Sequence, residues 1–75
     1  MKLYTMIIRG HKFYFTGNLK DELITATEQF CRQLESKTND SDPQKIFTLV
    51  LKYIKLVYGC SVTQLNIEHI FRINF

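Results

Sequence analysis

The polar positions between Lys45 and Tyr58 are few and regularly spaced. Every other residue of this stretch, KIFTLVLKYIKLVY, is apolar or aromatic. The spacing puts the polar side chains on one narrow stripe of an α-helix, which other elements must then cover on at least two sides. Asp42 followed by Pro43 is typical of a helix start and Gly59 of a helix end, so a helix is predicted at about 43–58. The polar positions are Lys45, Thr48, Lys52 and Lys55.

Two short segments near the start of the chain are rich in β-branched and aromatic residues, which predicts a β-hairpin at about 3–16. Gly10 and His11 fit the two central positions of a type II′ turn. In this register Arg9 faces Lys12, and apolar residues gather on one face of the hairpin. The residues expected in the core are Tyr4, Met6, Ile8, Phe13 and Phe15. The more solvent-exposed face is expected to carry Thr5, Ile7, Arg9, Lys12, Tyr14 and Thr16.

A second, ordinary amphipathic helix is predicted at about 19–36. Asn18 is expected to cap its first turn, with Asp21 at the third helical position. Residues 37–42 are polar and are predicted to form the loop between the two helices. The apolar side of this helix carries Leu23, Thr27, Phe30 and Leu34.

The tail alternates between apolar and polar residues, which predicts a C-terminal strand at about 67–75. Ile67, Ile70 and Phe71 also fit helical spacing, so a helix is the alternative, and the β-branched and aromatic content favours the strand. The expected fold is a small single α+β domain, 1–75, in ββααβ order. Its three-stranded, mainly antiparallel sheet would carry a helical hairpin on one face. The third strand would lie beside the second in an all-antiparallel order, or beside the first with one parallel pair.

Candidate chemistry is sparse, and we expect no catalytic, cofactor-binding or metal site. Cys31 and Cys60 form no paired-ligand or redox motif with each other or with the two histidines, His11 and His69. No secretory leader or membrane-spanning apolar run is visible, so a reducing cytoplasm with free thiols and no membrane partner is expected. No small-molecule ligand is implied either.

The net charge of +3 hides a segregation along the chain. Residues 1–20 are basic, 21–42 acidic and 43–75 basic again. A dipolar surface of this kind suits a protein partner better than a nucleic-acid duplex, which requires one continuous basic face.

The outer face of the predicted sheet is the candidate binding surface, because it combines apolar, aromatic and basic side chains. The leading hypothesis is a small non-enzymatic protein that acts by protein–protein contact, with self-association into a homodimer as one form of it. In size and style the chain looks like small accessory proteins of phages and mobile elements. The alternative is weak binding of single-stranded nucleic acid by stacking and phosphate contacts. The surface residues are Ile7, Arg9, Lys12, Tyr14 and Arg72.

Overall fold

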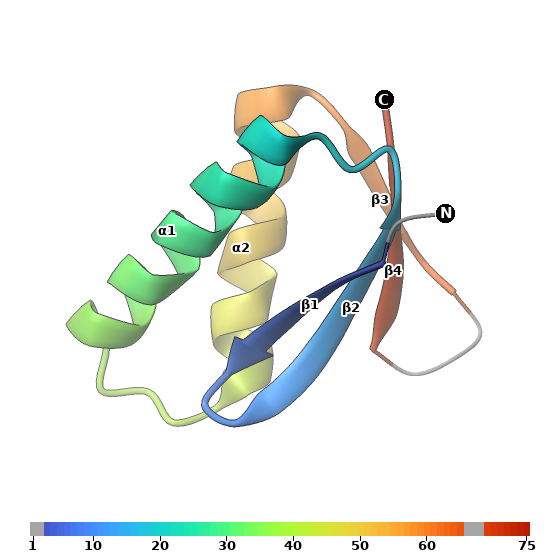
Figure 1. Cartoon of the computed structure of the whole chain (residues 1–75). Coiled ribbons are helices and arrows are strands. Elements are labelled where there is room, and N and C mark those ends of the chain that lie inside the picture. Colours follow the sequence, from blue (N-terminus) through green and yellow to red (C-terminus); the bar gives the residue numbers. More distant parts are fainter. Residues whose placement is uncertain (1–2, 66–68) are drawn as a thin grey trace.

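The computed structural model describes residues 3–65 and 69–75 and has a four-stranded mixed sheet with two helices on one face (Figure 1). The sheet order is β1-β2-β4-β3. The small α+β class agrees with the sequence prediction. The elements are β1 (Leu3–Ile8), β2 (His11–Gly17), α1 (Asp21–Lys37), α2 (Pro43–Tyr58), β3 (Ser61–Gln64) and β4 (Ile70–Asn74).

The prediction of three strands in ββααβ order is wrong, because the order is ββααββ. The additional strand, β3, has the sequence SVTQ and carries one apolar residue, Val62. So short and polar a segment has no alternation to distinguish it from a loop, and its strand conformation depends on pairing with β4. The predicted strand at 67–75 is present as Ile70–Asn74, and residues 67 and 68 lie outside the described part. The helix alternative is wrong for the residues described there.

The sheet is also less antiparallel than predicted. After α2 the chain enters the sheet at its far edge as β3, which runs antiparallel to β4. The chain then returns as β4 between β3 and β2, and so runs parallel to β2. The C-terminal strand was expected to run antiparallel to the second strand, so that prediction is wrong, and neither predicted strand order is correct.

The turn between β1 and β2 is formed by Arg9 and Gly10 rather than by Gly10 and His11. Both central residues have positive φ angles, 51° and 80°, as a type I′ turn requires. Ile8 therefore pairs with His11, and Ile7 with Lys12. The register differs from the predicted one by two residues, and since side chains alternate with a period of two, each residue keeps its predicted face. Thr16 is nevertheless buried, contrary to the expectation of a solvent-exposed side chain.

The start of α1 also differs from the prediction. The helix begins at Asp21 after Lys20, whose side chain makes no capping hydrogen bond. Asn18 is therefore not the cap, and its backbone N–H donates instead to the Ile73 carbonyl of β4 at 3.0 Å. Leu19 is buried in the core and joins β2 to the helix. Asn18 thus holds the end of β2 against β4.

Helix α2 has the predicted bounds and capping. The Asp42 side chain accepts a hydrogen bond from the Gln44 N–H at 3.0 Å, and Gly59 ends the helix in the left-handed conformation, φ 64°. The sheet covers one side of α2 and α1 covers another, where the Phe30 and Tyr53 rings stack at 4.2 Å. The predicted polar stripe is interrupted, however, because Leu49 and Leu56 lie exposed within it.

Phe47 of α2 is the centre of the core. Its ring is fully buried and lies 4.2 Å from the ring of Phe13 and 4.7 Å from that of Phe71, between centroids. Phe15 completes the cluster at 5.5 Å. Strands β1, β2 and β4 all direct apolar side chains toward α2, so the opposite face of the sheet is the one left uncovered by helices.

Candidate interaction surface

The sheet face opposite the helices carries apolar side chains that are partly exposed. Leu3 is 61% exposed and Ile7 48% exposed, and both lie on β1. Tyr14 of β2 is half-buried and pairs with Ile70 of β4, which is also half-buried. These four residues lie on the same face of three adjacent strands, with Thr5 between Leu3 and Ile7 on β1, and we call them the apolar strip. We call this face, with its basic residues described next, the outer sheet face.

Basic residues border this strip. Lys12 pairs directly with Ile7 across β1 and β2. Arg72 of β4 is exposed and pairs with Thr16 of β2. Four of the five candidate residues therefore share the outer sheet face, as the alternation of the strands predicts: Ile7, Lys12, Tyr14 and Arg72.

Arg9 is the exception, because it lies in the turn and reaches the end of α1. Its Nη2 donates to the carbonyl oxygens of Glu35 at 2.9 Å and Thr38 at 3.0 Å. Its Nε donates to the Asp40 carbonyl at 3.3 Å, and its backbone N–H donates to Glu35 Oε2 at 2.9 Å. Arg9 thus satisfies carbonyl groups at the C-terminal end of α1 and in the loop that follows. Among the candidate residues, all of which the structure describes, this leaves Lys12 and Arg72 as the cations of the outer sheet face.

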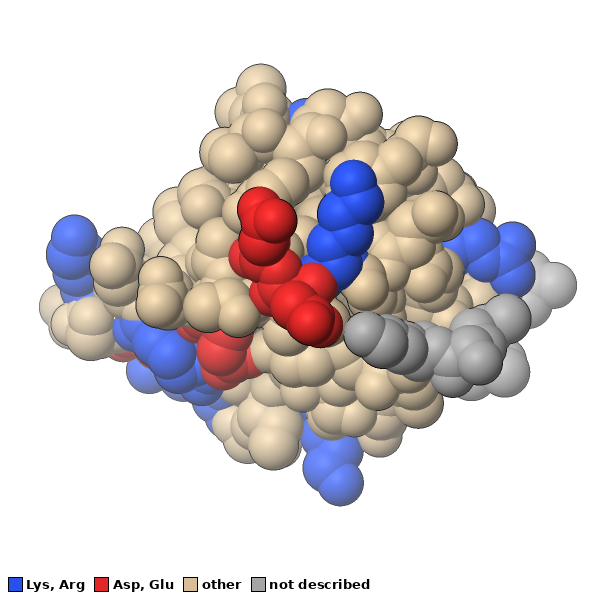
Figure 2. Space-filling view, turned by 45° about the horizontal axis from the view of Figure 1, so that its top comes forward, with Lys and Arg blue, Asp and Glu red and all other residues tan. Residues whose placement is uncertain are grey.

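The fold brings parts of the oppositely charged segments together. Arg9 reaches the acidic second segment, every residue of which is described, without forming an ion pair, since its guanidinium donates to backbone carbonyls and its backbone N–H meets the Glu35 carboxylate. Lys45, from the basic third segment, lies 3.7 Å from Asp40. In the view of Figure 2, basic side chains lie apart from one another and acidic side chains lie among them. Part of the segregated charge is therefore paired within the molecule, and this view shows no continuous basic patch.

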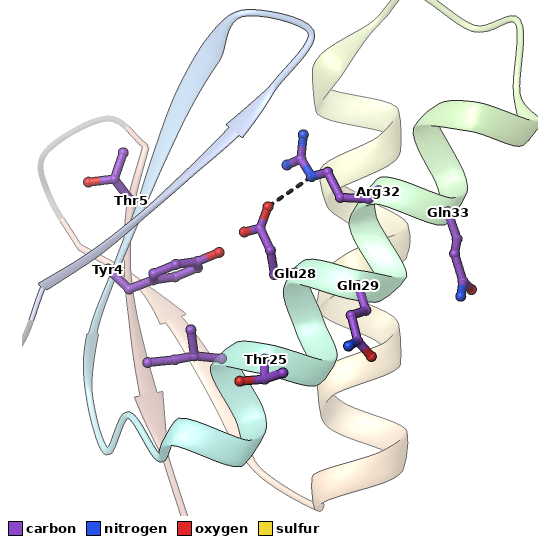
Figure 3. Close-up of a pocket in the computed structure, with 8 residues that line it drawn as sticks. Tyr4, Thr5, Thr25, Glu28, Gln29, Arg32 and Gln33 are labelled. Carbon is purple, nitrogen blue, oxygen red and sulfur yellow. Dashed lines mark ion pairs between the residues drawn. The ribbon is translucent and has the colours of Figure 1, made fainter.

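A groove runs between β1 and α1, with a volume of about 630 Å³ (Figure 3). Most of its exposed surface is carbon, although six of its eight lining residues are polar or charged. The Tyr4 ring points from β1 toward α1, and its hydroxyl is buried without a hydrogen-bond partner among the described residues. An ion pair, Arg32 Nε to Glu28 Oε1 at 2.8 Å, lies along the α1 wall. The lining residues are Tyr4, Thr5, Ile24, Thr25, Glu28, Gln29, Arg32 and Gln33.

The sequence did not predict this groove. Its existence depends on where α1 lies relative to β1, and hydrophobic periodicity carries no such information. One signal was present in the sequence, since Ile24 flanks the predicted apolar side of α1. Ile24 is half-buried and lines the groove.

The two cysteines are buried and free. Burial raises the pKa of the Cys31 thiol from 9.0 to about 11, with Glu35 and Glu28 adding to the shift and Arg32 opposing it. Burial also raises the pKa of Cys60. Reactive thiols require the opposite shift, toward thiolate at neutral pH. Neither cysteine therefore has the environment of a nucleophile, and the described residues contain no group of His, Cys, Asp and Glu that could hold a metal ion.

The raised pKa of Cys31 predicts a pH dependence of stability. The folded state holds this thiol protonated, so its contribution is complete below the unfolded pKa of 9.0 and is lost as pH rises toward the folded pKa of about 11. We expect the free energy of unfolding of the parent to fall more between pH 8.5 and 10.5 than that of Cys31→Ala, which has no thiol to titrate. Urea titrations of both proteins across this range measure the difference. Parallel curves would contradict the assignment.

Neither helix is long and apolar enough to cross a bilayer, within the part of the chain that the structure describes. Comparisons with protein-family models, with curated proteins and with solved structures gave no match to this chain.

Proposed function

We propose that this chain is a small non-enzymatic binding protein that acts by protein–protein contact through its outer sheet face. One observation carries the proposal: Leu3, Ile7, Tyr14 and Ile70 form a partly exposed apolar strip on the face that no helix covers. An apolar and aromatic centre with a polar rim is the usual anatomy of a protein interface. Tyrosine is also among the residues that most often dominate binding energy.

The rim indicates the chemistry of the partner. Lys12 and Arg72 border the strip, and both are exposed. In a symmetric homodimer the same patch meets itself, so these cations would face those of the second copy and repel them. A different protein with acidic residues around an apolar centre fits this face better than a second copy does.

Binding of single-stranded nucleic acid is the second candidate. Tyr14, Lys12 and Arg72 share one open sheet face, which is the arrangement that stacking and phosphate contacts require. Because Arg9 is hydrogen-bonded to the end of α1, fewer cations are available to contact phosphate groups. Tyr14 alone gives a single position on which a base could stack. For these reasons protein contact is the preferred proposal.

The test is a double variant, Ile7→Ser with Tyr14→Ala. We expect it to remain folded and to lose at least about tenfold in partner affinity, because it removes two apolar side chains from the centre of the strip. The measurement is quantitative capture of partner proteins on immobilised parent and variant, followed by titration of any protein that the parent retains.

Leu56→Ser is the matched control. Leu56 is an 85% exposed apolar residue on α2, which packs on the other face of the sheet, so its replacement should leave capture unchanged. Equal retention of the same protein by the parent and the double variant would show that the outer sheet face does not bind it. A mixed single-stranded oligonucleotide, titrated at low and high salt, separates the second candidate, for which affinity should fall steeply with salt.

A further inference from the structure

Within the described residues, strand β1 is an edge of the sheet, with β2 as its only strand partner. Ile8 and His11 flank the two-residue turn, and in such a hairpin this pair exchanges hydrogen bonds. The alternation then places the N–H and C=O of Leu3, Thr5 and Ile7 on the side away from β2.

Two hydrogen bonds confirm this alternation. Tyr14, opposite Thr5, directs its N–H away from β1 and donates it to the His69 carbonyl at 2.8 Å. The Ile7 carbonyl points away from β2 and accepts a hydrogen bond from Arg32 Nη2 of α1. No described residue makes a corresponding bond to the outward backbone groups of Leu3 or Thr5. Toward the residues that the structure describes, the outward donors and acceptors along the first half of β1 are therefore unpaired.

The groove described above lies along this edge. Its volume of about 630 Å³ is within the usual range of ligand sites, roughly 300–1,000 Å³. Ile24 and the Tyr4 ring supply apolar surface, and the buried Tyr4 hydroxyl lacks a partner among the described residues. A buried polar group without a hydrogen bond is unfavourable, and a ligand that supplies the bond recovers that cost.

We infer that this groove binds an extended segment of another polypeptide, which adds to the sheet as a fifth strand beside β1. An extended backbone complements the alternating N–H and C=O groups of Leu3 and Thr5. Alternate side chains of the segment then enter the groove against Ile24 and Tyr4, which selects apolar residues with one hydrogen-bonding group near the Tyr4 hydroxyl. Glu28 and Arg32 pair with each other, so no charged side chain is required at this wall.

A second copy of the chain does not fit this edge. Pairing two β1 edges in a symmetric antiparallel manner makes a continuous sheet whose helices lie on the same face. Helix α1 extends beside the β1 edge as a wall of the groove, so the two copies of α1 would meet there. A single extended segment avoids this collision. The site uses backbone groups of the edge, and it is therefore separable from the side chains of the outer sheet face.

The test uses a phage-displayed library of random nine-residue peptides, selected on the intact parent protein. The selected peptide is then labelled and titrated by fluorescence polarisation. Thr5→Pro removes the outward N–H without removing a bond to β2, and proline is tolerated at such edge positions. We expect Thr5→Pro to weaken binding by about tenfold, as the loss of one main-chain hydrogen bond predicts. Thr5→Val keeps the N–H and the β-branched shape and should bind within about twofold of the parent.

A second variant keeps the test independent of any effect of proline on β1. Thr25→Trp places a large ring at the exposed α1 wall of the groove and should abolish peptide binding while leaving the strand intact. Tyr14→Ala, on the outer sheet face, should bind the peptide as the parent does. In the parent, the bound peptide should slow hydrogen exchange of the Thr5 amide. Failure to select any peptide, or undiminished binding to both Thr5→Pro and Thr25→Trp, would overturn the inference.

Discussion

Gly17→Ala is expected to lower the free energy of unfolding by about 3–5 kcal/mol, a large share of the ~5–15 kcal/mol typical of a domain. Gly17 has a φ of 95°, where an L-residue is strained, at a cost of about 1–2 kcal/mol. A Cβ added there would lie 2.5 Å from the Ile73 carbonyl oxygen, which is backbone and cannot rotate away. Strands β2 and β4 would have to separate, and the Asn18 N–H would lose its bond to the same oxygen.

Gly10→Ala is the matched control, because Gly10 also has a positive φ, 80°, but an added Cβ would meet no atom within 4 Å. It should cost only the conformational strain of about 1–2 kcal/mol. Urea unfolding followed by circular dichroism measures both variants. Equal losses for the two glycines would show that strand contact at Gly17 contributes nothing beyond backbone strain.

Phe47→Ala is expected to cost about 3–5 kcal/mol, the range measured for large core aromatics. The Phe47 ring is fully buried and contacts the rings of Phe13 and Phe71, so its removal leaves a cavity beneath two strands at once. Thermal unfolding should show a correspondingly lower midpoint, or an unfolded protein at 25 °C if the parent is only marginally stable.

Leu56→Ala on the same helix provides the contrast. Leu56 is 85% exposed, so its truncation should change stability by no more than about 0.5 kcal/mol. A large loss at Leu56 combined with a small loss at Phe47 would mean that α2 is turned about its axis relative to the sheet.

Helix α2 could be predicted to the residue because its signals are local. Asp42 and Pro43 start it, and Gly59 ends it in a conformation that glycine adopts easily. The sequence predicted Gly10 and His11 at the centre of the first hairpin turn, whereas the turn is formed by Arg9 and Gly10, because Gly10 fits both arrangements. The observed turn requires a positive φ at Arg9, which is hydrogen-bonded to Glu35, 26 residues away. No local pattern contains such a contact.

The residues of the outer sheet face could be predicted because side chains alternate along a strand. An error of two residues in register leaves every side chain on its own face, so Ile7, Lys12 and Tyr14 remained correctly placed. The position of Arg9 and the groove beside β1 were not predictable, because both depend on how the end and the flank of α1 lie against the hairpin. Strand β3 was missed because four residues with one apolar side chain carry too little pattern.

The central claim is that the outer sheet face contacts a protein. Its most direct test is photo-crosslinking with p-benzoylphenylalanine in place of Tyr14, and separately in place of Leu56, within cells that produce the chain. We expect a discrete protein adduct from position 14 that is absent from position 56 and is competed by excess unlabelled parent. Adducts from position 14 that nuclease removes, or a specific protein adduct from position 56 alone, would contradict the claim.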